Sequence, residues 1–238
     1  MNETIEHFGD LTIIIPTLNE EPNIESLLTL ITNLYPDVHV IVADDGSMDN
    51  TQQIVRAMHE KNPNVVLFDR SSYKIHGLTA SVYDSILLCQ TKYFFVIDGD
   101  FQHPPEKIAD GYDLLKKSDC DLVVGYREEV ENWGVSRKLM SWVATMIGKL
   151  SLFLRRKPRV KDIMSGFFGG KTQSVAALLK TRPDKIAPTG YKILFDILKQ
   201  CPSEWKLCEF PYVFKNRAFG KSKISRKHII AFLLSTIK

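Results

Sequence analysis

The chain lacks the short motifs that mark several common nucleotide-binding and cysteine-dependent sites. Its four cysteines are scattered and include no C-x-x-C pair. Neither a zinc ribbon nor a disulfide framework is therefore indicated, and reduced thiols in a cytosolic setting are expected. The absence of G-x-x-x-x-G-K-[ST] excludes a P-loop nucleotidase. No G-x-G-x-x-G follows the first apolar run and no G-x-S-x-G is present, which argues against a dinucleotide-binding domain and a nucleophile-elbow hydrolase.

Acidic residues are missing from two long segments, although the whole chain of 238 residues carries only a net charge of +3. Residues 132–161 contain eight basic side chains and residues 210–238 contain seven, so all 28 acidic residues lie elsewhere. An acidic body with two basic segments indicates an anionic partner: phosphate, nucleic acid or a lipid surface. The first ten residues, MNETIEHFGD, are polar and acidic, so they do not form a signal peptide.

Apolar runs alternate with helical patterns over the first half of the chain. Strands are expected within residues 11–16, 38–47, 64–69, 92–100 and 121–127, and helices after the first three of them. This alternation predicts right-handed βαβ crossovers and a mostly parallel sheet with helices on both faces. The alternation ends near Arg127, so the last hundred or so residues follow another plan.

Polar clusters lie at the carboxyl ends of four of these expected strands. They are Pro16–Glu20, Asp44–Ser47, Asp98–Asp100 and Gly125–Arg127. Ligands of open parallel sheets bind beyond the carboxyl ends of the strands. We therefore expect these four clusters to meet at one ligand site.

Two carboxylates at one strand end, Asp98 and Asp100, repel each other unless a proton or a cation lies between them. They could form an acid–base pair, hold Mg²⁺ or Mn²⁺, or only solvate the strand end. Hard divalent cations take oxygen ligands, usually one or two carboxylates and substrate phosphates. Gln102 offers another oxygen, and Gly99 leaves room for close approach of the backbone. His103 is either a further ligand or a structural loop residue.

Several segments, in this order, resemble the family 2 glycosyltransferases of the GT-A fold. The segments are P-T-L-N-E-E-P-N-I, V-A-D-D-G-S-M-D-N-T and D-G-D-F-Q-H-P-P-E, followed by G-Y-R-E, W-G-V-S-R-K-L-M-S, V-K-D-I-M-S-G-F-F, G-Y-K-I-L-F-D-I-L and R-A-F-G-K-S-K. The Q-H-P-P after the paired carboxylates is most similar to the polyprenol-phosphate sugar transferases, above all the dolichyl-phosphate mannose synthases. The resemblance covers residues 11 to about 230 and implies a single GT-A domain over residues 1–238.

The resemblance implies roles for individual residues on the donor side. The nucleotide sugar would be bound by Pro16, Leu18, Glu20, Ala43, Asp45, Asp98, Gly99, Asp100, Gln102, Arg217 and Lys223. The metal, Mg²⁺ or Mn²⁺, would be held by Asp98, Asp100 and Gln102, and would neutralise the departing nucleoside diphosphate. GDP-mannose is the expected donor and UDP-glucose the near alternative.

On the acceptor side the resemblance implies a polyprenyl or dolichyl monophosphate, contacted by Arg127, Arg137 and Ser141. Such a phosphate is largely dianionic at neutral pH, so it needs positioning rather than a general base. Asp100, Arg127, Arg217 and Lys223 are the expected catalytic residues, and attack opposite the leaving group inverts the anomeric centre. Asp162 either orients one of these cations or caps a helix.

A polyprenyl acceptor implies a membrane, and the enzyme is expected at its cytoplasmic face. Residues 142–154 are apolar and lead into R-R-K-P-R, but they are too few to span a bilayer as a helix. Within the segment 133–160 they fit an amphipathic helix at the membrane interface. Residues 224–238 are apolar, and either begin a membrane tail or form a short interfacial helix. A membrane-anchoring partner subunit is a further possibility.

Other functions remain open at this stage. A family 2 transferase with a soluble glycan acceptor would share the donor site, and a non-catalytic membrane-binding module would share only the fold. A sugar nucleotidylyltransferase should carry a glycine-rich, basic loop after the first strand, which P-T-L-N-E-E is not. No nucleic-acid partner is expected, because the first basic segment is interrupted by a long apolar run that suits phosphate tracking poorly.

Overall fold

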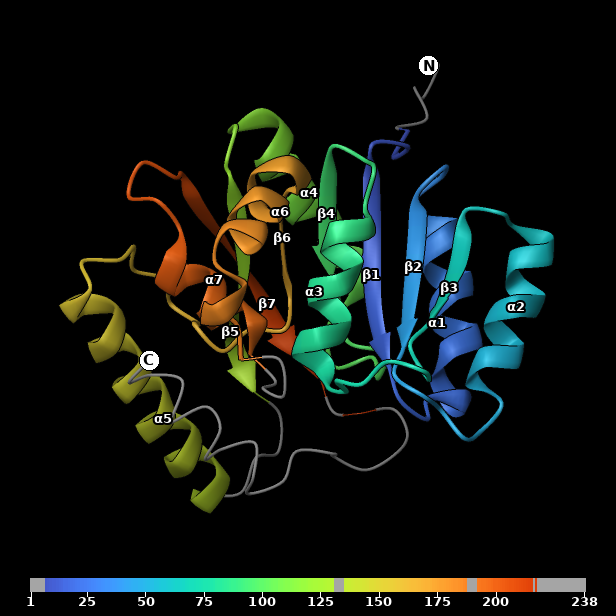
Figure 1. Cartoon of the computed structure of the whole chain (residues 1–238), viewed down its shortest axis with the longest axis horizontal. Coiled ribbons are helices and arrows are strands. Elements are labelled where there is room, and N and C mark those ends of the chain that lie inside the picture. Colours follow the sequence, from blue (N-terminus) through green and yellow to red (C-terminus); the bar gives the residue numbers. More distant parts are fainter. Residues whose placement is uncertain (1–6, 131–134, 188–191, 216, 218–238) are drawn as a thin grey trace.

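The chain forms a seven-stranded sheet covered by helices on both faces (Figure 1). The computed structural model describes residues 7–130, 135–187, 192–215 and 217. Its strands are β1 Leu11–Thr17, β2 His39–Asp44, β3 Val65–Asp69, β4 Tyr93–Val96, β5 Leu122–Val130, β6 Phe168–Lys171 and β7 Leu207–Phe214. Its helices are α1 Glu21–Leu34, α2 Thr51–Lys61, α3 Leu78–Leu88, α4 Ile108–Lys117, α5 Val135–Leu154, α6 Thr172–Thr181 and α7 Ile193–Gln200, with short 3₁₀ turns η1 Pro105–Lys107 and η2 Pro183–Lys185.

The strand order is β3-β2-β1-β4-β6-β5-β7. Strands β1, β2, β3 and β4 pair in parallel, as do β5 and β7, whereas β6 runs antiparallel to both of its neighbours. Six strands therefore share one direction, which confirms the mostly parallel sheet expected from the sequence. The order reverses between β1 and β4, and such a switch point is where open α/β sheets bind ligands.

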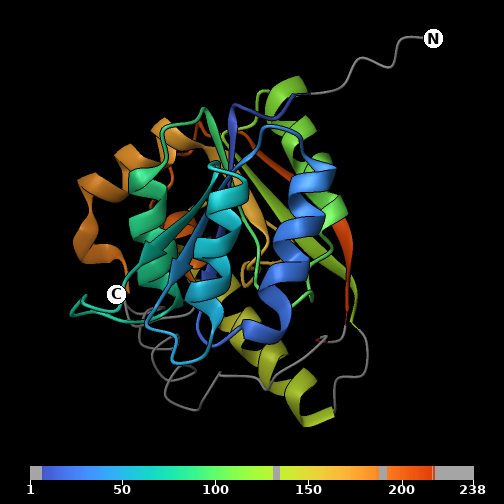
Figure 2. The same ribbon diagram turned by 90° about the vertical axis from the view of Figure 1, so that its right-hand side faces the viewer.

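Alternate strand residues supply two separate cores, because successive side chains point to opposite faces of the sheet. Ile13, Ile15 and Phe95 pack against α1, α2 and α4. Ile14 and Phe94 pack on the other face against α3, α6 and α7. Figure 2 shows the sheet between these two groups of helices. Full burial of both faces explains why the strands read as continuous apolar runs.

Close packing leaves no room for a side chain at Gly169 of β6. A Cβ atom there would lie 2.5 Å from Cδ2 of Phe95 and 2.6 Å from the carbonyl oxygen of Phe94. We expect Gly169→Ala to lower the free energy of unfolding by about 1–3 kcal/mol, the usual cost of overpacking. Urea denaturation measures this effect, and Gly9→Ala is the control because its Cβ would lie 3.9 Å from the nearest atom. Equal stabilities for the two variants would contradict the packing described.

One pair of cysteines contradicts the expectation of reduced thiols. Cys120 and Cys208 form a disulfide, with their Cα atoms 6.1 Å apart, so the expectation of four reduced cysteines is wrong for this pair. The reason is the pairing of β5 with β7, strands 88 residues apart at these cysteines, which sequence spacing does not reveal.

The apolar segment 142–154 lies in α5, as expected for a helix. In the described ranges, no helix is both long enough and apolar enough to cross a bilayer. The apolar segment 224–238 lies outside the described residues.

Candidate active site

The polar clusters at the ends of β1, β2 and β4, together with Arg127 of β5, lie at one edge of the sheet, because these four strands run in the same direction. In Figure 1 the arrowheads of β1, β2 and β5 point to this common edge. The convergence predicted from the sequence is thus confirmed. Its centre lies beyond β4, beside the switch in strand order.

Asp98 and Asp100 lie directly after β4 and have different surroundings. Asp100 is 5% exposed, and its Oδ2 lies 2.8 Å from a terminal nitrogen of Arg217. The same guanidinium donates to Oε1 of Gln102 at 3.3 Å. The side chain of Asp98 remains 29% exposed. Arg217 thus contacts two of the three oxygen-bearing residues expected to hold a metal.

The paired carboxylates are electrostatically unfavourable without a cation. Burial raises the pKa of Asp98 to about 6, Glu20 adds to this rise, and Lys192 and Arg217 oppose it. Burial and the neighbouring Asp98 also raise the pKa of Asp100, against the opposing charge of Arg217. A divalent cation at this position would relieve the repulsion and restore both ionised carboxylates.

His103 is a structural residue. Its ring is 2% exposed and stacks on Phe167 with centroids 5.1 Å apart, while Tyr212 and Phe214 meet it edge-on. Burial lowers its pKa to about 3, so the ring is neutral. Its Nδ1 accepts the backbone N–H of Asp98 at 3.3 Å, which orients the loop that carries the carboxylates.

The donor set fits a cation shared with a substrate. In the part of the chain that the structure describes, no group of three or more His, Cys, Asp or Glu side chains could hold a metal by itself. Mg²⁺ and Mn²⁺ do not need such a group when phosphates supply the remaining ligands. Asp98, Asp100 and Gln102 therefore fit a cation that is bound together with a diphosphate.

The backbone of Gly166 packs closely against the carboxylate of Asp98. A Cβ atom at Gly166 would lie 3.2 Å from both carboxylate oxygens of Asp98 and 3.2 Å from Cε1 of His103. We expect Gly166→Ala to shift this carboxylate and weaken Mn²⁺ binding roughly tenfold, since ligand placement sets metal affinity. Titration of Mn²⁺ by electron paramagnetic resonance measures this. Gly9→Ala is the control, because its Cβ would lie 3.9 Å from the nearest atom and Gly9 lies at the opposite end of β1 from the site; equal affinities in the two variants would refute the role of Gly166.

Arg127 extends from β5 into the same site and is fixed by Asp162. Its Nε donates to Oδ2 of Asp162 at 2.7 Å and its terminal nitrogen donates to Oδ1 at 3.2 Å. Burial opposes ionisation of Asp162, but the guanidinium outweighs it and lowers the pKa of the carboxyl group. Of the two roles considered for Asp162, orientation of a cation is the one that this contact confirms.

Lys192 brings a further positive charge between these pairs. Its ammonium group donates to the carbonyl oxygen of Met164. Burial and the nearby Arg127 lower its pKa to about 8, whereas Asp98 and Asp162 oppose this change. Lys192 is therefore a site residue that sequence reasoning missed, although it lies in the segment G-Y-K-I-L-F-D-I-L that carries part of the resemblance.

The loops after β1 and β2 are tied together by their own polar residues. Oγ1 of Thr17 donates to Asp44 at 2.9 Å, and Asp44 also accepts the backbone N–H of Ser47 at 2.8 Å. Asn19 has a left-handed backbone conformation, with φ of 53°. Its backbone N–H donates to Oγ of Ser47, and its side-chain oxygen accepts the backbone N–H of Met48. Asp44 is fully buried, and its hydrogen bonds stabilise the two loops. Asp45 is therefore the residue of this pair that can contact a ligand.

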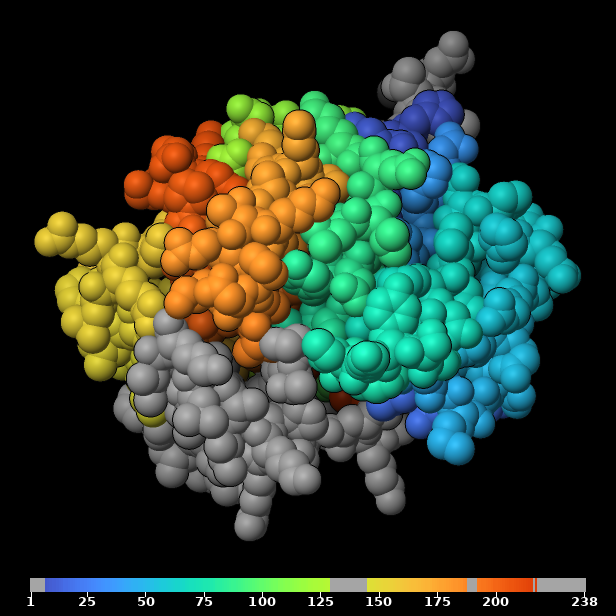
Figure 3. Space-filling model, viewed as in Figure 1, coloured from blue at the N-terminus to red at the C-terminus, as the bar shows by residue number. Residues whose placement is uncertain are grey.

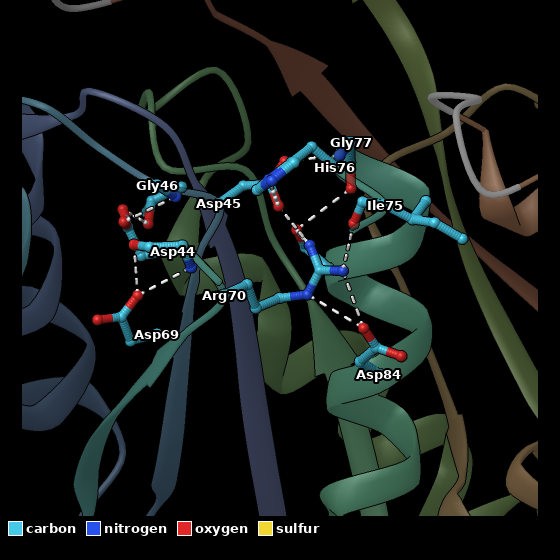
Figure 4. Close-up of polar contacts among 12 residues, drawn as sticks. Asp44, Asp45, Gly46, Asp69, Arg70, Ile75, His76, Gly77 and Asp84 are labelled. Carbon is cyan, nitrogen blue, oxygen red and sulfur yellow. Dashed lines mark hydrogen bonds and ion pairs between the residues drawn. The ribbon is translucent and has the colours of Figure 1, made fainter. Parts of the chain in front are cut away.

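Asp45 is held by a buried arginine that sequence reasoning also missed (Figure 4). Arg70 is 1% exposed and forms ion pairs with Asp45 and Asp84, the latter at 2.9 Å. Oδ2 of Asp45 accepts the backbone N–H of Gly77 at 2.6 Å, and Oδ1 lies 3.1 Å from Nδ1 of His76. A carboxylate has about four acceptor positions, so one remains for a ligand. The sequence signal that could have identified Arg70 as a site residue is its position directly after the third strand.

The structure describes some of the remaining predicted site residues in full, some only by their backbone, and one not at all. Leu18 is 38% exposed beside the site, Pro16 is partly buried in β1, and Glu20 is buried with its Cγ 3.4 Å from the Cβ position of Gly99. Ala43 is fully buried in β2, and its expected contact with the donor stays a prediction. The backbone at Arg137 and Ser141 lies in α5, as the expected i, i+4 spacing requires, and Lys223 lies outside the described residues.

The chain is similar to known proteins along most of its length. Residues 12–179 match the model of the family described as glycosyl transferase family 2. A dolichol-phosphate mannosyltransferase of Pyrococcus furiosus is 34% identical over 94% of this chain, which spans 61% of that relative's length. The Saccharomyces cerevisiae protein of the same name is 28% identical, with 94% of this chain and 84% of the relative covered.

Among solved structures, glucosyl-3-phosphoglycerate synthase of Mycobacterium tuberculosis, in complex with Mn²⁺, UDP and glucosyl-3-phosphoglycerate, superposes with a TM-score of 0.63. Its sequence is 18% identical, and the match covers 95% of this chain and 77% of that one. This likeness confirms the expected GT-A fold.

Proposed function

Since the chain belongs to glycosyl transferase family 2, we propose that it transfers mannose from GDP-mannose to a dolichyl or other polyprenyl monophosphate. The observation that carries the proposal is the pair of carboxylates after β4, Asp98 and Asp100. Arg217 forms an ion pair with Asp100, and the Arg127–Asp162 pair lies nearby. This arrangement offers a cation site for a leaving diphosphate and fixed positive charge for a second phosphate. The names of the relatives from Pyrococcus furiosus and Saccharomyces cerevisiae support the choice of substrates.

Donor binding is assigned to the loops after β1, β2 and β4. We assign the nucleoside to Pro16, Leu18, Glu20 and Asp45, and the diphosphate to Asp98, Gly99, Asp100 and Gln102 with a divalent cation. The Mycobacterium tuberculosis structures with Mn²⁺ or Mg²⁺ and UDP support this assignment. When bound, the cation neutralises the negative charge that develops on the leaving diphosphate. Arg217 and Lys223 are proposed to close over the same phosphates.

Acceptor binding is assigned to Arg127, Arg137 and Ser141, and Lys192 joins them as a fourth candidate. The phosphate monoester is itself the nucleophile, because it is largely dianionic at neutral pH. The neutral, stacked ring of His103 agrees with a reaction that needs no histidine base. The residues therefore position the acceptor oxygen opposite the leaving group, and the sugar is transferred with inversion.

Arg217 occupies the position next to the carboxylates that a cation would take. We expect Arg217→Ala to bind Mn²⁺ roughly tenfold more tightly in the absence of nucleotide, because Asp100 and Gln102 lose a competing positive charge. The same variant should bind GDP with Mn²⁺ more weakly, since a phosphate contact is lost. Calorimetric titrations measure both affinities. A lower Mn²⁺ affinity without nucleotide would show that Arg217 does not compete for the site.

The membrane contact is assigned to α5. The described side chains Met146, Leu150, Phe153 and Leu154 are exposed large apolar residues on this helix, and R-R-K follows them. An apolar helix face with a basic end suits the surface of an anionic bilayer. We place the enzyme at the cytoplasmic face, and a membrane-anchoring partner subunit would strengthen its attachment.

A transfer assay tests the proposed reaction. Dolichyl phosphate in detergent is incubated with Mn²⁺ and with labelled GDP-mannose or UDP-glucose in parallel, and label is followed into the organic phase. The proposal predicts lipid-linked mannose. Lipid-linked glucose would instead establish the alternative donor, and label on a soluble glycan alone would replace the acceptor. Donor binding without any transfer would refute the proposed acceptor, and no metal-dependent donor binding would favour a non-catalytic module.

A further inference from the structure

A second group of basic side chains lies away from the strand ends. A cavity of about 190 Å³ opens between the end of α5, helix α6, the turn η2 and the end of α7. Figure 3 shows the surfaces of α5 (yellow) and of α6 with η2 (orange) next to each other on this side. The basic residues around the cavity come from three segments that lie apart in the sequence, 155–157, 182–185 and the end of α7: Arg155, Lys157, Arg182, Lys185 and Lys199.

Carboxylates lie close to two of these basic side chains. Lys199 lies 2.9 Å from Asp196, and Lys185 lies 3.9 Å from Asp184, whose side chain is 67% exposed. Lys157 donates to the carbonyl oxygen of Cys201 at 3.1 Å. The residues that line the cavity include five basic side chains and no acidic one, so this partly enclosed space attracts an anion more strongly than an open surface does.

Gln200 lines the cavity, but its side-chain oxygen is closed off from solvent. The side-chain nitrogen of Gln200 donates to the carbonyl oxygen of Asp196 at 3.0 Å. Its side-chain oxygen is buried and has no hydrogen-bond partner among the residues described. A buried acceptor without a donor is unfavourable. Because no solvent reaches this oxygen, the proposed ligand contacts are those of the basic side chains alone.

The surface beside the cavity is apolar. Phe153 and Leu154 are 56% and 73% exposed and come directly before Arg155. The helix ends in a fixed turn, where Arg156 has φ of 54° and the N–H of Lys157 donates to the carbonyl oxygen of Leu152. Basic and exposed apolar groups therefore lie next to each other, which suits a ligand with a phosphate and an apolar chain.

We propose that this cavity binds the phosphate of an anionic lipid headgroup, at a site separate from the acceptor phosphate. Lys192 of the candidate active site comes immediately before α7, whereas Gln200 is its last residue. Eight residues of helix separate them, a distance of about 12 Å. The headgroup site would fix the orientation of the enzyme on the bilayer, and in this respect it rests on the membrane location given in the proposed function.

Vesicle flotation tests the inference with Arg182→Ala/Lys185→Ala and the charge-matched control Lys116→Ala/Lys117→Ala in α4. The vesicles contain phosphatidylcholine alone, or with roughly a quarter phosphatidic acid. The site predicts a roughly 30-fold weaker partition of the first variant onto anionic vesicles, because each basic residue near such a surface contributes about 1 kcal/mol. The control should bind as the wild type does, and transfer to detergent-dispersed dolichyl phosphate should be equal in all three proteins.

Three results would overturn the inference. Equal partition of the wild type and the Arg182/Lys185 variant would exclude the headgroup site, and an equal loss in the control would show that only overall charge matters. Partition of the wild type onto phosphatidylcholine vesicles as strong as onto the anionic vesicles would show that the protein recognises no anionic headgroup. Failure of the proposed reaction is distinguished from these outcomes, because it would remove transfer in the wild type while leaving the vesicle result unchanged.

Discussion

Asp100→Asn is expected to reduce the rate of sugar transfer by roughly 10²–10³-fold or more, the usual effect of removing one preorganised group that stabilises developing charge. Asparagine has nearly the size of aspartate, so the loop after β4 keeps its packing. What is lost is one of the two carboxylates that would bind the cation. The variant should also bind Mn²⁺ more weakly, and Arg217 loses the partner that lies 2.8 Å away.

Steady-state transfer and Mn²⁺ titration measure these two effects separately. Asp113→Asn in α4 is the control, since its carboxylate is 41% exposed and pairs only with Lys117 among the ion pairs described. The control should keep the activity of the wild type. If Asp100→Asn transfers sugar within about threefold of the wild-type rate, Asp100 supplies no charge that the transition state needs.

Arg70→Met is expected to lower the free energy of unfolding by about 3–5 kcal/mol, because removal of one partner leaves buried charge uncompensated. Arg70 is 1% exposed and joins Asp45 to Asp84, whose side chains are 9% and 27% exposed. It also donates to Oγ of Ser81 at 3.0 Å and to the carbonyl oxygen of Ile75 at 2.9 Å. Methionine fills much of the same space but makes none of these contacts.

The matched control is Arg56→Met, which removes an arginine from an exposed pair. Arg56 lies 3.4 Å from Asp69 and both side chains are well exposed, so a change within about 1 kcal/mol is expected. Equilibrium urea unfolding compares the variants. A similar small loss for Arg70→Met would mean that solvent replaces its contacts and that the network in Figure 4 does not stabilise the fold.

The first half of the fold could be predicted because its signals are local. Apolar β-branched runs such as residues 11–16 end in polar turns, and each is followed by a helical pattern, so β1 to β5 and the helices between β1 and β4 follow from sequence alone. Strand β6 could not be predicted, because Phe168–Lys171 is short and rich in glycine. It is a strand because Gly169 and Gly170 allow close packing between β4 and β5.

The candidate site could be predicted where residues lie at the end of a strand expected from the sequence, as Asp98, Asp100 and Arg127 do. Contacts between distant segments could not be predicted. Arg70 reads as a surface residue until α3 brings Asp84 beside it, and Lys192 reads as the start of an ordinary helix. Ala43 is assigned to the donor by the resemblance alone, and the sequence does not reveal that the adjacent strands bury it completely.

Binding of Mn²⁺ in the presence of GDP tests the central claim most directly. Electron paramagnetic resonance distinguishes free from bound Mn²⁺ without any turnover. The account predicts about one Mn²⁺ per chain, bound more tightly with GDP than without it, since the diphosphate completes the ligand set. Asp98→Asn/Asp100→Asn should abolish that binding. GDP-dependent Mn²⁺ binding that survives in the double variant would contradict the account, because the cation would then lie elsewhere in the protein.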